Sequence, residues 1–219
     1  MNQIQYDEKK LFQNIYCVGR NYTAFAEEMG NKPTETPIVF LKPTHSLAIM
    51  NDCDICFDPS GDIVNGEAEI VLSIGRAYEK GISIDELVDK MTIGIDFTYR
   101  KRLNKVKDNG QPWLPAKGFS GAAALGVFKQ FSLKDIQSKE FSMLLNGKTA
   151  QAASASQMIF SLQQLVDFIG NNYGLDAGDL IYTGTPKGIV TLQDGDHLEV
   201  KYGEESLGVC DIRFKSEML

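Results

Sequence analysis

Two glutamates separated by one residue are the feature of this sequence that most directly indicates chemistry. Glu67 and Glu69 lie in the strand-like run 66–74, where they alternate with alanine, isoleucine and leucine. Because side chains alternate between the two faces of a strand, both carboxylates project from one face, roughly 7 Å apart. A solvated strand face is the other interpretation of the same pattern.

A second strand-like run, 93–99, places an aspartate in the same way. Its isoleucine, phenylalanine and tyrosine side chains share one face, which leaves Asp96 with Gly94 and Thr98 on the other. Glu67, Glu69 and Asp96 can therefore converge on one site. Three carboxylates in a concave site repel one another and stay protonated unless a cation neutralises them.

An all-oxygen ligand set of this kind predicts Mg²⁺, Mn²⁺ or Ca²⁺ rather than zinc, which normally takes His or Cys ligands. The chain has two histidines, His45 and His197, and they lack the spacing of a helical zinc motif. A Mg²⁺ ion held by three carboxylates keeps positions open for water and for a chelating substrate.

Composition and charge argue against a nucleic-acid-binding, membrane-bound or secreted protein. The chain has 219 residues with 22 Lys and Arg against 29 Asp and Glu, a net charge of −7, which disfavours nucleic-acid and anionic-membrane partners. No apolar run approaches the roughly 18 residues of a membrane span, and the polar start lacks the layout of a signal peptide. We therefore expect a cytoplasmic protein.

Cys53 and Cys56 have redox-motif spacing, but structural thiols are the favoured interpretation.

The periodicities predict one β-rich α+β domain over residues 1–219, with many strands and about three helices. Strands are expected at 15–18, 38–41 (buried), 67–74, 92–99, 141–145, 180–183, 197–202 and 207–214, with a hairpin turn at Asn146-Gly147. Helices are expected at 21–29, at 84–91 and from Ser161 onward. The basic residues, glycine and prolines of 100–117 predict a mobile loop.

Seven short motifs, in this order, resemble the fumarylacetoacetate hydrolase family over residues 15–214, nearly the whole chain. They are Val18-Gly19-Arg20-Asn21-Tyr22, Phe40-Leu41-Lys42-Pro43, Gly66-Glu67-Ala68-Glu69, Asp96-Phe97-Thr98-Tyr99-Arg100, Ala116-Lys117-Gly118-Phe119, Met158-Ile159-Phe160 and Thr183-Gly184-Thr185-Pro186.

The resemblance implies a catalytic domain of mixed β-sheets that form a roll or sandwich, commonly assembled as a homodimer. It implies that Glu67, Glu69 and Asp96 bind one Mg²⁺ or Mn²⁺, that Lys117 contacts the substrate or its enolate, and that Arg20, Tyr22 and Thr185 line the pocket. Family members act on small 2-oxo acids and 1,3-diketo acids through a metal-bound enolate. Their reactions are oxaloacetate decarboxylation or tautomerisation and C–C bond hydrolysis of acylpyruvates or fumarylacetoacetate.

One position departs from the hydrolytic members of the family. Phe25 stands where they carry a histidine, although Glu28 keeps the place of the acid and is the candidate base. A lone glutamate, with a reference pKa of about 4.3, is a weak base for water, so the departure disfavours hydrolysis more than decarboxylation or tautomerisation. Hydrolysis without the dyad and a non-catalytic metal- and ligand-binding paralog are the alternatives.

Several basic residues have two interpretations. Lys101 stands where the family usually has an aspartate, and the extra cationic charge of this segment suits a dicarboxylate such as oxaloacetate. Lys42 is interpreted as a strand-end salt bridge or a motif residue, and Lys117 as a solvated loop lysine or the family's lysine. His45 is either a surface imidazole or a replacement for the missing base.

Overall fold

The fold is described by a computed structural model that covers residues 12–23 and 34–215. The predicted helix at 21–29 therefore falls mostly outside the described residues, as do Phe25 and Glu28. Within the described ranges, the structure is β-rich with mixed sheets and five α-helices, as predicted for the fold class. No helix of these ranges has the length and apolar character that a membrane crossing requires.

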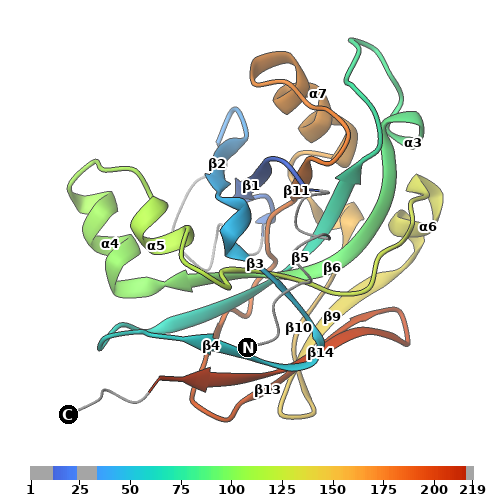
Figure 1. Ribbon diagram of the computed structural model, residues 1–219. Helices are drawn as coiled ribbons and strands as arrows, with labels where there is room; N and C mark the ends of the chain where they lie inside the picture. The colour runs from blue at the N-terminus through green and yellow to red at the C-terminus, as the bar shows by residue number, and fades with distance from the viewer. Residues whose placement is uncertain (1–11, 24–33, 216–219) are drawn as a thin grey trace.

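Two sheets form the framework (Figure 1). The larger one has the order β2-β1-β11-β5-β6-β7-β3, with β12 paired to β5 and β8 to β6. Its strands are β1 (Ile15–Gly19), β2 (Ile38–Lys42), β3 (Leu47–Ile49), β5 (Val64–Ile74), β6 (Val88–Tyr99), β7 (Ala123–Leu125), β8 (Lys129–Gln130), β11 (Leu180–Tyr182) and β12 (Val190–Thr191).

The smaller sheet has five strands in the order β10-β9-β13-β14-β4. They are β4 (Asn51–Phe57), β9 (Glu140–Leu145), β10 (Lys148–Ser154), β13 (His197–Tyr202) and β14 (Glu205–Phe214). The predicted hairpin is confirmed, because β9 pairs with β10 and both Asn146 and Gly147 have positive φ, as a type I′ turn requires. The main apolar core takes side chains from both sheets, including Ile70, Phe97 and Val200.

The helices are short and lie around the two sheets, with α3, α4 and α5 against β6 of the larger sheet and α6 against β10 of the smaller one (Figure 1). They are α3 (Ile84–Leu87), α4 (Arg100–Asp108), α5 (Leu114–Lys117), α6 (Leu133–Ser138) and α7 (Leu162–Asn172), with 3₁₀ turns η1 (Thr44–Ser46) and η2 (Ala155–Gln157). The predicted helix after Ser161 is confirmed as α7, and its Ser161 and Gln164 form a capping box. The sequence interpretation missed α6 and strands β3, β4, β7, β8 and β12.

Two predictions were wrong, one in the length of a helix and one in the burial of a strand. The helix at 84–91 ends at Leu87, because Val88, Lys90 and Met91 pair with β5 as the start of β6. Strand 38–41 exists as β2, but it is an edge strand rather than a buried one, and Leu41 is 52% exposed.

The prediction of a mobile loop at 100–117 was also wrong, because most of this segment is helical. On α4, Leu103 and Val106 are buried against Ala116 and Trp113. The first turn of α4 is capped from a distance, since Asp62 accepts hydrogen bonds from the backbone N–H groups of residues 101 and 102. This segment, α4 and α5, lies at one end of the larger sheet (Figure 1).

Candidate active site

The pairing of β5 with β6 brings the predicted carboxylates to one place. Glu67 lies directly opposite Asp96 in the antiparallel register, and Glu69 lies opposite Gly94. Opposite residues project to the same side of the sheet, so all three acids face one cavity of about 60 Å³. Glu67, Glu69 and Asp96 are 5%, 2% and 2% exposed. We call this cavity, with these three residues in its wall, the acidic pocket.

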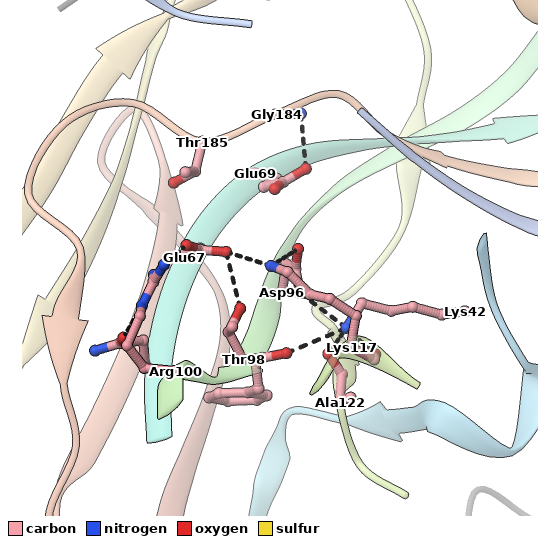
Figure 2. A network of polar contacts seen from close by, with 12 residues as sticks. Lys42, Glu67, Glu69, Asp96, Thr98, Arg100, Lys117, Ala122, Gly184 and Thr185 are labelled. Carbon is pink, nitrogen blue, oxygen red and sulfur yellow. Dashed lines mark hydrogen bonds and ion pairs between the residues drawn. The ribbon is translucent and has the colours of Figure 1, made fainter. Parts of the chain in front are cut away.

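Lys117 joins two of the acids. It ends α5, and its Nζ donates hydrogen bonds to Glu67 Oε2 and Asp96 Oδ2, both at 2.6 Å (Figure 2). Burial by itself lowers the pKa of Lys117, but the charges of Asp96 and Glu67 outweigh burial and raise the pKa well above its ordinary value. The side chain is therefore an ammonium held inside the acidic pocket rather than a solvated loop lysine.

Lys42 lies on the far side of Asp96 and is completely buried. Its Nζ is 2.8 Å from Asp96 Oδ1 and donates to the carbonyl oxygens of Phe97, Lys117 and Ala122 (Figure 2). Burial acts to raise the pKa of Asp96, but Lys117 and Lys42 together lower it, so Asp96 is ionised. Lys42 therefore does form an ion pair at the end of β2, but the pair is buried, and it fixes Asp96 and the end of α5.

Glu69 has no cation within ion-pair distance in the described part of the chain. Within residues 12–23 and 34–215, its carboxylate accepts one hydrogen bond, from the backbone N–H of Gly184 to Oε2 at 2.7 Å (Figure 2). Burial, and then the charge of Asp96, raise the pKa of Glu69 well above its ordinary value. Burial of a carboxylate without a counter-charge raises the free energy of the folded state. Binding of a cation beside Glu69 would remove this cost.

The other predicted pocket residues are partly brought together. Arg20 and Thr185 line the acidic pocket, and Arg20 has a φ of 61°, a strained backbone conformation of the kind that persists at functional sites. Tyr22 does not line the pocket. Its buried hydroxyl has no hydrogen-bond partner among residues 12–23 and 34–215, and its ring packs edge-on against Phe141. Burial, followed by the charge of Glu69, raises the pKa of Tyr22.

Sequence reasoning missed three cationic residues of the site. The sequence pattern does not place Lys42 at this site, and Arg100 and Lys107 belong to the segment 100–117 that it predicts as a loop. Arg100 Nη2 is 3.1 Å from Glu67 Oε1, and Lys107 lines the acidic pocket. Lys101, the residue singled out in the sequence, instead points its Nζ at the Gly61 carbonyl oxygen and is exposed. Recognition of α4 as a helix would have separated Lys107 from Lys101. His45 is exposed and does not line the acidic pocket, as expected of a surface imidazole.

The donor set fits a hard divalent cation in its chemistry. Three buried carboxylates face one cavity, and one of them lacks a counter-charge. In the described residues, no three acidic, histidine or cysteine side chains are gathered closely enough to surround one ion, because the Lys117 ammonium lies between Glu67 and Asp96. Glu67 and Asp96 can therefore join Glu69 in binding one ion only if Lys117 breaks at least one of its hydrogen bonds to them.

The mixed-sheet fold and the acidic pocket define a family that comparison with known proteins identifies. A model of the fumarylacetoacetate (FAA) hydrolase C-terminal domain matches residues 14–215. This chain therefore belongs to the fumarylacetoacetate hydrolase family, a family of enzymes, and the predicted resemblance is confirmed.

Several relatives have been named individually. The chain is 32% identical over 200 residues to oxaloacetate tautomerase YcgM of Escherichia coli (strain K12), covering 88% of this chain and 90% of that protein. It is 31% identical over 189 residues to mitochondrial oxaloacetate decarboxylase of Dictyostelium discoideum, covering 84% and 85%. Among solved structures, fumarylpyruvate hydrolase from Pseudomonas aeruginosa in complex with Mn²⁺ and pyruvate superposes with a TM-score of 0.85 at 26% identity, covering 93% and 91%.

Proposed function

We propose that this chain is a divalent-metal-dependent enzyme that acts on small 2-oxo acids through their enolates, with the keto–enol tautomerisation of oxaloacetate as its reaction. The observation that carries the proposal is the Lys117 ammonium held between Glu67 and Asp96 in a pocket that also contains the uncompensated Glu69. Relatives named oxaloacetate tautomerase, and a Mn²⁺ complex of a fumarylpyruvate hydrolase, support the substrate class and the metal.

Glu67, Glu69 and Asp96 would hold Mg²⁺ or Mn²⁺, and the ion when bound would supply positive charge that stabilises an enolate. The chain's own cations complete the site. Lys117 stabilises the enolate oxygen with its ammonium, and Arg20 and Thr185 position carboxylate oxygens of the substrate. Lys42 holds Asp96 ionised and anchors the carbonyl oxygen of Lys117, which fixes the end of α5.

Proton transfer at carbon needs a base, and Glu28 is the candidate, although it lies outside the described residues. Tautomerisation removes a proton from the carbon beside the 2-oxo group and returns one to oxygen, so no water molecule must be activated. Loss of the family histidine at Phe25 therefore harms this reaction less than hydrolysis.

Decarboxylation of oxaloacetate is the second candidate, because loss of CO₂ in place of a proton leaves the enolate of pyruvate, which the same cations would stabilise before it takes up a proton. The similarity to an oxaloacetate decarboxylase favours it as a further reaction of the same site. Hydrolysis of acylpyruvates and a non-catalytic binding paralog remain the alternatives that the following assay separates.

We expect metal-stripped protein to be inactive and to recover activity when Mg²⁺ or Mn²⁺ is added. Oxaloacetate should show faster decay of its enol absorbance on addition of either ion, and acetylpyruvate should not be cleaved. Pyruvate and CO₂ from oxaloacetate would assign decarboxylation, and pyruvate and acetate from acetylpyruvate would assign hydrolysis. Stabilisation of the protein against heat by these compounds, without their consumption, would support the binding paralog and contradict the proposed activity.

We also propose that the chain works as one catalytic domain and assembles as a homodimer, as the family resemblance implies. Leu41 of edge strand β2 and Leu114 of α5 are 52% and 57% exposed, and both line one groove of about 780 Å³. A second copy of the chain would cover this apolar surface. Light scattering after gel filtration should give about twice the chain mass of 24.3 kDa, and substitution of Leu41 by glutamate should shift it toward one chain.

A further inference from the structure

The acidic pocket contains more positive than negative side chains. Four cationic residues line it, Arg20, Arg100, Lys107 and Lys117, against its three carboxylates. Lys117 and Arg100 form ion pairs with these carboxylates, but Lys107 and Arg20 form no ion pair and no hydrogen bond within the described residues. A bound divalent cation would increase the positive surplus, so the pocket is suited to a ligand with more than one negative charge.

Lys107 is held at the pocket by α4. Arg100, Leu103 and Lys107 have the i, i+3, i+7 spacing of one helix face, and all three line the pocket. The Lys107 Nζ lies 4.8 Å from the centre of the Trp113 ring, which is also part of the pocket wall. The side chain is half-buried. Lys107 is therefore presented to the pocket by α4 and Trp113 rather than left free in solvent.

The electrostatic surroundings of Lys107 are unfavourable without a ligand. Partial burial, followed by the charges of Arg20, Arg100 and Lys117, lowers the pKa of Lys107 to about 8. The ring face of Trp113 offsets part of this cost, because the negative face of an indole ring attracts a cation. An anionic group between Lys107 and Arg20 would relieve the repulsion between them.

We propose that Lys107, together with Arg20, binds the second carboxylate of the substrate and so selects 2-oxo dicarboxylates over 2-oxo monocarboxylates. The inference rests on the proposed function, because the first carboxylate and the 2-oxo oxygen are assigned to the metal side of the pocket. A purely structural role, in which Lys107 only packs on Trp113, is the rival explanation. The two explanations differ in whether loss of Lys107 changes discrimination between ligands.

Trp113 provides a readout that does not depend on turnover, because it is the one tryptophan of the chain and contacts Lys107. Malate and 2-hydroxybutyrate are the probes, since they are stable and differ by a carboxylate in place of a methyl group. Each is titrated against the wild-type protein and against Lys107→Met in saturating Mg²⁺, with Trp113 fluorescence as the signal. Wild-type protein should prefer malate, and the preference should fall roughly 10- to 100-fold in Lys107→Met because a charge-assisted hydrogen bond is lost.

Two variants serve as controls. Lys105→Met removes the same charge from the exposed face of α4 and should keep the malate preference, and Lys107→Arg should retain most of it. The thermal shift caused by Mg²⁺ in Lys107→Met reports whether the pocket is intact. Equal affinities of the wild type for both probes, no saturable response to malate, or an unchanged preference in Lys107→Met would overturn the inference. Lost malate preference in Lys107→Met, in a protein that does not convert oxaloacetate, would instead reject the proposed reaction and keep the binding role.

Discussion

Glu69→Gln should abolish metal-dependent turnover and, at the same time, raise the melting temperature of the metal-free protein. Glu69 is buried, and in the described residues it has no cation at ion-pair distance, so at neutral pH folding must either bury its charge or protonate it, and both cost stability when no metal is bound. Glutamine keeps the shape and leaves an oxygen to accept the Gly184 N–H. Because roughly 1 kcal/mol moves the melting temperature of a domain of this size by about 2–4 °C, a rise of a few degrees is expected.

The effect on activity has the opposite sign and is much larger. A catalytic metal contributes several kcal/mol of transition-state stabilisation, and about 1.4 kcal/mol corresponds to a tenfold change in rate. Loss of a charged ligand should therefore lower oxaloacetate turnover by roughly a thousandfold or more. Addition of Mg²⁺ or Mn²⁺ should raise the melting temperature of the wild type but not that of Glu69→Gln.

Glu140→Gln is the matched control, because Glu140 is an exposed glutamate at the start of β9. This variant should retain both the metal-induced thermal shift and the activity. Glu69→Gln with wild-type turnover, or with an unchanged thermal response to both ions, would show that Glu69 does not hold a catalytic metal.

The polar strand faces of the site were predictable from sequence because strand periodicity is local. Alternation in 66–74 and 93–99 predicted on which face Glu67, Glu69 and Asp96 lie, and the structure places all three at one pocket. Short-range signals also succeeded at the Asn146-Gly147 turn and at the capped start of α7. Each of these patterns is set by residues within a few positions of one another.

The cations of the site were harder to place because their positions depend on contacts between distant segments. The basic composition of 100–108 suggested a loop, yet Asp62 caps α4 from about 40 residues away, and Leu103 packs against Ala116. Such contacts decide which lysine of α4 faces the pocket. Lys42 likewise reads as a strand-end residue, and only the neighbouring β6 and α5 show that it is enclosed.

The enclosure of Lys42 leads to the second large prediction, that Lys42→Met will lower the free energy of unfolding by about 3 kcal/mol or more. Methionine has a side chain of similar length, but it lacks the ammonium group, so that Lys117 is left as the one cation paired with Asp96 in the described residues. It also removes the donor to three buried carbonyl oxygens, those of Phe97, Lys117 and Ala122. Buried acceptors and charges that lose a partner account for most of the expected loss.

Equilibrium unfolding in urea measures this effect, and Lys148→Met is the matched control. Lys148 is exposed at the start of β10, so its removal should change the free energy of unfolding by no more than about 0.5 kcal/mol. Addition of Asp96→Asn to Lys42→Met should recover part of the lost stability, because removal of both charges of a buried pair costs less than removal of one. An unchanged urea midpoint in Lys42→Met would mean that Lys117 alone neutralises Asp96. The position of α5, and with it that of the Lys117 ammonium, would then have to be maintained by the packing of Leu103 and Trp113 around Ala116.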